Sequence, residues 1–102
     1  MKHFSNAFFA VLLGLSLVTA AQAGGNADAG KNKVASCGAC HGNDGNSQIP
    51  SNPKLAGQGE KYLLKQLKDV QRGDRVIAMM TGQLDNYNDA DLADIAAYYA
   101  SQ

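Results

Sequence analysis

The segment Val34–Ser47, VASCGACHGNDGNS, decides how the rest of this chain is interpreted, because it contains both cysteines and one of the two histidines. Their order is Cys37-Gly38-Ala39-Cys40-His41. A Cys-x-x-Cys pair can form a disulfide, act as a thiol redox pair, bind a metal or attach a haem covalently. The remainder of the sequence distinguishes these chemistries.

The first 23 residues are typical of a secretory signal peptide. Lys2 gives a positive start, residues 8–15 are apolar or glycine, and Ala21-Gln22-Ala23 has the small residues that signal peptidase requires. The apolar run is too short for a membrane anchor. We expect cleavage after Ala23, export to the periplasm, and one mature domain over residues 24–102 with no membrane span.

The charges argue against a nucleic-acid partner. The chain has 9 Lys or Arg and 9 Asp or Glu residues, which are scattered, with no basic block and no aromatic residues interleaved with basic ones. Such a pattern does not indicate nucleic-acid binding. A domain this small has a marginal core and commonly needs a disulfide, a metal or a cofactor for stability.

Hydrophobic periodicity and helix-end signals predict an all-α domain of about three to five short helices. Asn26 can cap the first helix, and Gly73 suits the end of a later one. No segment shows the sustained alternation of a strand. The predicted helices cover residues 27–36, residues 60–72, and a last segment that begins after a cap at Asn88 or Asp89.

A long loop follows the cysteine motif. Residues 42–59 are rich in glycine and proline, with asparagine and serine between them. A loop of this length in a small domain is usually functional or wrapped around something.

Covalent attachment of a c-type haem explains the motif best. Each thiol adds across one haem vinyl group, and two cysteines on one turn can reach both vinyls, with the following histidine under the iron. A thioredoxin-like site needs a βαβ context, a structural zinc site needs four ligands, and so short a disulfide loop adds little stability. We expect Cys37 and Cys40 to hold one haem c and His41 to bind its iron, with a dithiol or disulfide as the alternative.

The second axial ligand is expected to be a methionine. His3 lies in the leader, and Met79 and Met80 are the methionines of the mature chain. A methionine pair is by default core filler, but a histidine-ligated haem needs a partner. Methionine and histidine together raise the reduction potential, which suits an electron carrier.

Three stretches together resemble class I c-type cytochromes, and within them one half of a bacterial periplasmic cytochrome c4, with cytochrome c-553-type monohaem carriers as close relatives. The stretches are CGACHGNDGNS (37–47), PKLAGQGEKYLLKQL (53–67) and MTGQLDNYNDADLADIAAYYASQ (80–102). The resemblance implies a small cytochrome c fold, with the long loop wrapped around the haem. It also implies that the helix before the motif crosses the C-terminal helix at Gly30, against Tyr98 or Tyr99.

The same resemblance assigns roles around the histidine. The carbonyl oxygen of Pro53 would accept a hydrogen bond from Nδ1–H of His41, with Pro50 as the competing acceptor. Leu55 would pack on the proximal side of the ring. Support of this kind fixes the tautomer of a ligating histidine and tunes its basicity.

The resemblance also chooses between the methionines. In the cytochrome c4 pattern the ligating methionine precedes Thr-Gly, which selects Met80 and leaves Met79 as a packing residue. Cytochrome c4 has two haem domains in tandem, whereas this chain has one such motif. Both a monomer and a homodimer are therefore compatible with the resemblance.

The expected function is one-electron transfer in the periplasm, not enzymatic catalysis. A six-coordinate iron has no open position for a substrate, so it would cycle between Fe(III) and Fe(II), linking a respiratory donor to a terminal oxidase or reductase. The alternatives are a haem-based sensor or small-ligand-binding protein with a labile Met80, and a non-haem thiol oxidoreductase. The lysines of residues 60–72 and Lys54 can dock an acidic partner, although a solvated helix face is the simpler interpretation.

Overall fold

Helix α4 (Asp89–Ala100) is at the centre of the computed structural model, which describes residues 2, 10, 14 and 24–102. No strand occurs among the described residues, and the all-α prediction is confirmed. None of the described helices has the length and apolar character that crossing a bilayer requires. The predicted cleavage after Ala23, and the leader residues next to it, lie outside the described residues. The other described elements are α1 (Ala27–Lys31), α2 (Ala35–His41), α3 (Glu60–Arg72) and the 3₁₀ turn η1 (Ala78–Met80).

The single helix predicted over residues 27–36 is wrong, because the chain forms two helices there. Asn26 caps α1 as expected, its side chain accepting a backbone N–H of the first turn at 2.9 Å. After Asn32 the chain turns tightly, with the Lys33 N–H donating to a carbonyl three residues earlier at 2.9 Å. The Lys33 carbonyl accepts a hydrogen bond from the Tyr87 hydroxyl at 2.9 Å. The interruption between α1 and α2 therefore coincides with a contact to a distant segment. The local sequence pattern does not predict such a contact.

The two longer helices have the ends that their sequence signals predict. α3 ends at Gly73, whose φ of 81° lies in the left-handed region that glycine adopts without strain. The Asn88 side chain accepts a hydrogen bond from Asp91 N at 2.8 Å, and the Asp91 carboxylate accepts one from Asn88 N at 3.0 Å. This reciprocal capping box makes Asn88, rather than Asp89, the cap of α4.

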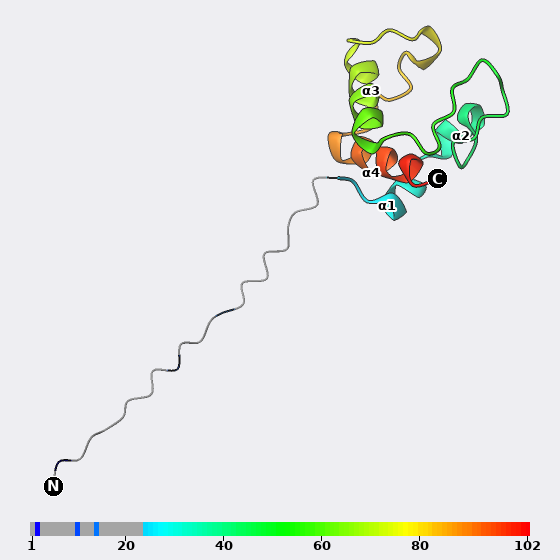
Figure 1. Ribbon diagram of the computed structural model, residues 1–102. Coiled ribbons are helices and arrows are strands. Elements are labelled where there is room, and N and C mark those ends of the chain that lie inside the picture. The colour runs from blue at the N-terminus through cyan, green and yellow to red at the C-terminus, as the bar shows by residue number, and fades with distance from the viewer. Residues whose placement is uncertain (1, 3–9, 11–13, 15–23) are drawn as a thin grey trace.

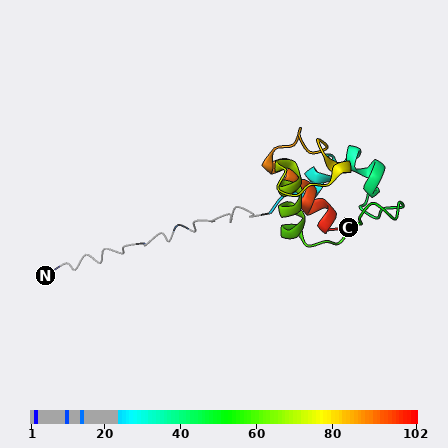
Figure 2. The same cartoon turned by 90° about the horizontal axis from the view of Figure 1, so that it is seen from above.

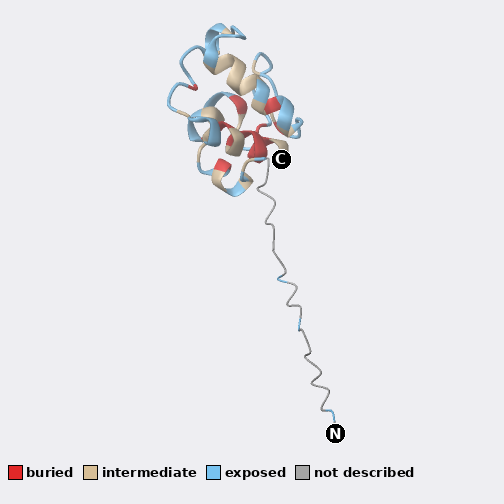
Figure 3. Ribbon diagram, turned by 90° about the vertical axis from the view of Figure 1, so that its left-hand side faces the viewer, coloured by how far each residue is buried: buried red, intermediate tan, exposed pale blue. Residues whose placement is uncertain are grey.

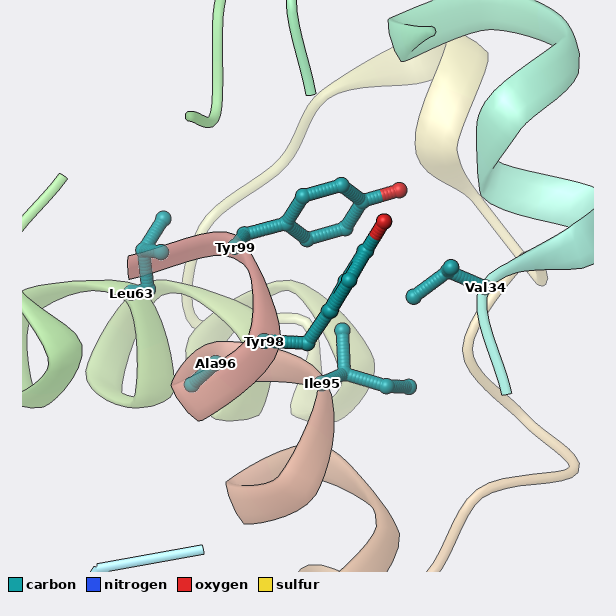
Figure 4. Packing of buried hydrophobic residues seen from close by; sticks show 6 residues of the cluster. All are labelled: Val34, Leu63, Ile95, Ala96, Tyr98 and Tyr99. Atoms are coloured by element: carbon teal, nitrogen blue, oxygen red, sulfur yellow. The ribbon is translucent and has the colours of Figure 1, made fainter. Parts of the chain in front are cut away.

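Both α1 and α3 pack against α4 (Figures 1 and 2). The buried positions gather where these helices meet (Figure 3). The rings of two consecutive tyrosines of α4 pack against each other with their centroids 5.2 Å apart. The buried core cluster consists of Val34, Leu63, Ile95, Ala96, Tyr98 and Tyr99 (Figure 4).

The crossing of α1 over α4 depends on Gly30. A Cβ atom at this position would lie 2.0 Å from Asp94 O and 2.8 Å from Tyr98 Cβ. Two backbones this close leave no room for a side chain. The close approach predicted at Gly30 is confirmed, and its aromatic neighbour is Tyr98 rather than Tyr99.

The loop over residues 42–59 folds back on the end of α4. Gly45 O accepts a hydrogen bond from Leu55 N at 2.8 Å, which closes the loop on itself. Gly57 N donates to Tyr99 O at 2.9 Å, which ties the far end of the loop to α4. These bonds fix the path of the loop, which begins where α2 and the cysteine motif end.

Candidate functional site

Helix α2 carries the three residues of the predicted haem-attachment motif. Cys37 is half-buried, Cys40 is exposed, and neither is paired in a disulfide. Because residues three apart lie on one face of a helix, the two thiols share a face of α2. Burial is the main cause that raises the pKa of the Cys37 thiol. His41 is the last residue of the helix and is 8% exposed.

The loop orients the His41 ring. Nδ1 of His41 lies 2.9 Å from the carbonyl oxygen of Pro53, the acceptor that the resemblance favoured over Pro50. A carbonyl oxygen can only accept, so Nδ1 carries the proton and donates. In the neutral ring Nε2 then keeps its lone pair, which is the form that binds a metal.

Loop side chains also hold the end of α2, through contacts that the sequence did not predict. The carbonyl oxygen of Cys40 accepts hydrogen bonds from Asn52 Nδ2 at 2.9 Å and from Ser47 Oγ at 3.2 Å. The last carbonyls of a helix lack partners within it, so polar loop residues are the natural source. The loop contains several Asn and Ser residues, and only the folded path of the chain shows which of them reach Cys40.

The apolar candidates differ in burial. Leu55 is half-buried and packs against the core cluster. Met80, the last residue of η1, is half-buried, whereas Met79 is 83% exposed. The expectation that Met79 packs inside the domain is therefore wrong. In a 3₁₀ turn successive side chains point about 120° apart, so adjacent methionines cannot both face inward.

The turn that carries Met80 lies on the same side of the domain as α2 (Figures 1 and 2). The fold thus brings the segments of His41 and Met80, which are far apart in the sequence, to one side of the core. Their roles as iron ligands stay predictions.

An unpartnered hydroxyl lies at the edge of the core, next to α2. Tyr99 is 1% exposed, and within the described residues its hydroxyl is the one buried side-chain N or O atom that lacks a hydrogen-bond partner. Burial is the main cause that raises its pKa. The Tyr98 and Tyr99 rings point to the same side, toward the start of α2 (Figure 4), and Cys37 packs against the same cluster. A buried hydroxyl without a full partner costs about 1–3 kcal/mol, and a group bound beside the Cys37 thiol would be placed to supply one.

The donor set has the chemistry of a c-type haem site. Two thiols on one helix face can form thioethers, Nε2 of His41 keeps its lone pair, and the turn that carries the half-buried Met80 lies on the same side of the domain. The residues that would hold this group are Cys37, Cys40, His41 and Met80, with Pro53 behind the histidine. The proximal role of Leu55 stays a prediction.

Most of the chain is similar in sequence to c-type cytochromes. The model of the cytochrome c family matches residues 27–102. Cytochrome c4 of Pseudomonas aeruginosa is 61% identical over 92 residues, which cover 90% of this chain and 46% of that protein. Cytochrome c-554(548) of Halomonas halodenitrificans is 46% identical over 81 residues, which cover 76% of this chain and 98% of that protein. The chain thus spans about half the length of the cytochrome c4 relatives that it matches.

The backbone of the chain is also similar to that of a solved cytochrome c4 structure. The crystal structure of reduced recombinant cytochrome c4 from Pseudomonas stutzeri has a TM-score of 0.75 with this chain at 57% identity. The match covers 76% of this chain and 46% of that structure. Sequence and backbone therefore both correspond to one half of such a protein.

Proposed function

Because this chain belongs to the cytochrome c family, we propose that it binds one haem c covalently and carries single electrons in the periplasm. Cytochrome c4 proteins are electron-transfer proteins and not enzymes. In this proposal residues 1–23 are a cleaved signal peptide and residues 24–102 form one cytochrome c domain. The proposal holds for a monomer and for a homodimer.

The observation that carries the proposal is the hydrogen bond from His41 Nδ1 to Pro53 O, at 2.9 Å. It holds the ring in the tautomer whose Nε2 can bind iron, next to two thiols on the same helix. Cys37 and Cys40 would anchor the haem as thioethers, and Leu55 would exclude water from the histidine side. Restraint of this kind keeps ligand geometry constant between oxidation states, which a fast electron carrier requires.

The thioether of Met80 would be the second protein ligand of the iron. When bound, the haem would supply an Fe(III)/Fe(II) couple, and His41 and Met80 would hold its iron without a place for a substrate. Met80 is half-buried and Met79 is largely exposed, which supports the choice of Met80. The alternative, a haem-based sensor, requires Met80 to leave easily.

The proposed partners are a respiratory donor complex and a terminal oxidase or reductase. A shallow groove on α3 supports docking to an acidic protein face, because basic side chains dominate its lining. Redox partners form weak, salt-sensitive encounters, so turnover should fall as ionic strength rises. The residues that line the groove are Lys61, Leu64, Lys65, Lys68, Asp69 and Arg72.

Expression with the native leader, in a bacterium that attaches haem in its periplasm, tests the proposal. The intact mass should equal that of a polypeptide starting at Gly24 plus one haem, and the variant with Cys37→Ala and Cys40→Ala should lack the added mass. The reduced protein should bind carbon monoxide slowly or not at all. Rapid binding would favour the sensor, and a wild type with two free thiols and no haem would favour the thiol oxidoreductase.

A further inference from the structure

Near its C-terminal end, the segment between α3 and α4, residues 73–88, is bonded to α3 through the side chain of Gln71. The amide group of Gln71 donates hydrogen bonds to Leu84 O at 2.8 Å and to Tyr87 O at 2.6 Å. Gln71 is itself partly buried on α3. Leu84 and Tyr87 follow Met80 by four and seven residues. Gln71 therefore holds the part of the segment that comes directly after the proposed ligand in the sequence.

Tyr87 extends this contact to the helix that carries the cysteine motif. Its hydroxyl donates to Lys33 O at 2.9 Å and lies 3.2 Å from Ser36 Oγ. Ser36 belongs to the first turn of α2 and directly precedes Cys37. One residue of the Met80 segment is therefore bonded at its carbonyl to α3 and at its hydroxyl to the start of α2.

Among the residues that the structure describes, the middle of the segment makes hydrogen bonds only within its own turns. Met80 N donates to Ile77 O at 2.9 Å, and Gln83 N donates to Met80 O at 3.0 Å, both within turns. At the N-terminal end Arg75 is held to α3, its N–H donating to Asp69 O at 3.0 Å. The hydrogen bonds that tie this segment to α3 are therefore at its two ends, and Leu84, 2% exposed, is buried near the C-terminal one.

We propose that Gln71 and Tyr87, together called the polar strap, are positioning residues that hold Met80 against the haem iron. The strap fixes the Met80 segment relative to both α3 and α2, and so relative to His41. Loosening it should raise the fraction of molecules in which Met80 has left the iron. The inference rests on the proposed function, because it takes Met80 as the ligand.

Gln71→Glu is the sharpest test of the strap. A glutamate carboxylate has the shape of the glutamine amide but only accepts, so it would face two carbonyl oxygens with no proton to offer. Gln83→Glu is the matched control, because it adds the same charge in the Met80 segment and no side-chain hydrogen bond is found for Gln83 among the described residues.

The first readout is the affinity of the oxidised haem protein for free imidazole, which binds only where Met80 has left. The apparent affinity is the intrinsic affinity multiplied by that fraction. Gln71→Glu should bind imidazole about tenfold more tightly than Gln83→Glu, as expected for the loss of two hydrogen bonds. Equal affinities in the two variants would overturn the proposal.

Tyr87→Phe tests the other end of the strap without a change of charge. It keeps the carbonyl that Gln71 binds and removes the hydroxyl that reaches α2, and Tyr62→Phe, on a side chain 55% exposed, is its control. We expect imidazole affinity to rise about threefold or more in Tyr87→Phe and to stay unchanged in Tyr62→Phe. This variant keeps the proposal testable if Gln71→Glu does not fold.

Amide hydrogen exchange of residues 77–83 separates the strap from the proposed ligation. Exchange in this segment should be faster in Gln71→Glu than in Gln83→Glu, with α4 unchanged, whichever methionine binds iron. A uniform acceleration over the whole domain would mean that Gln71 only adds global stability, which contradicts the proposal. If Met80→Ala leaves the haem spectrum unchanged, the proposed ligation fails, and the exchange result still decides on the strap.

Discussion

Replacement of Gly30 by alanine should strongly destabilise the domain, because the added methyl group would fall where α1 crosses α4. The added Cβ would lie 2.0 Å from Asp94 O, and ordinary C···O contacts are about 3.3 Å or longer, so α1 would have to move by roughly 1.3 Å. The atoms it meets are backbone atoms of α4 and the Cβ of Tyr98, none of which can rotate away.

The expected cost is large because a backbone must move. Overpacking of a core usually costs about 1–3 kcal/mol, and a clash between backbones belongs at or above the upper end of that range. For a domain of this size about 3 kcal/mol corresponds to a fall in Tm of at least about 12 °C. Urea unfolding of the haem-loaded protein, followed by circular dichroism, measures the free energy of unfolding directly.

Gly59→Ala is the matched control for this experiment. Gly59 has a φ of −61°, and its added Cβ would have Tyr62 Cβ as its nearest neighbour at 3.8 Å. Gly59 is the N-cap of α3, where alanine is less favourable than glycine, so this substitution should lower the free energy of unfolding by about 1 kcal/mol or less. A Gly30→Ala protein as stable as Gly59→Ala would refute the close crossing of α1 and α4.

Two further substitutions test contacts of α4. Lys33, whose Nζ lies 2.7 Å from Asp91 Oδ1, holds the pKa of the Asp91 carboxyl below its usual value of 3.8. The backbone N–H of Asn26 lowers the pKa of Asp94 in the same way. The stability that these contacts contribute is therefore present above pH 3.8 and is lost as the pH falls through the folded-state pKa. Lys33→Met should therefore be less stable than wild type near neutral pH, with a gap that narrows below pH 3.8 in urea unfolding; a constant gap would contradict this. Tyr98→Phe removes a 2.8 Å hydrogen bond to Asn43 O and should cost about 1 kcal/mol of unfolding free energy by the same assay, whereas no change would mean that the bond does not hold the loop.

The features that sequence predicted well are those that depend on neighbours along the chain. The cap at Asn26 and the glycine end at Gly73 need only local backbone geometry, and both are present. The choice between Asn88 and Asp89 needed one more fact, the reciprocal bond to Asp91, which a structure supplies.

The errors have a common physical cause, which is dependence on distant parts of the chain. The break between α1 and α2 coincides with the bond from the Tyr87 hydroxyl to Lys33 O, and 54 positions separate the two residues. The burial of Met79 was misjudged because a short apolar stretch does not reveal which side of a 3₁₀ turn faces the domain.

In the candidate site, too, the local features were predicted and the contacts between distant residues were not. Cysteine and histidine spacing predicted the chemistry of α2, and the resemblance predicted the contact between His41 and Pro53, which the structure contains. Asn52 and Gln71 were not predicted, because an amide that donates to a carbonyl leaves no periodic pattern in a sequence. Such residues are found only when the path of the loop is known.

The near-infrared methionine-to-iron absorption band of the oxidised protein tests the central claim most directly. The spectrum should be recorded for the wild type, for Met80→Ala, and for Met79→Ala as the matched control one position away. The band should be present in the wild type and in Met79→Ala and absent from Met80→Ala, because His41 and Met80 are the proposed axial ligands. A band that survives in Met80→Ala, or that is missing from the wild type, would contradict the claim.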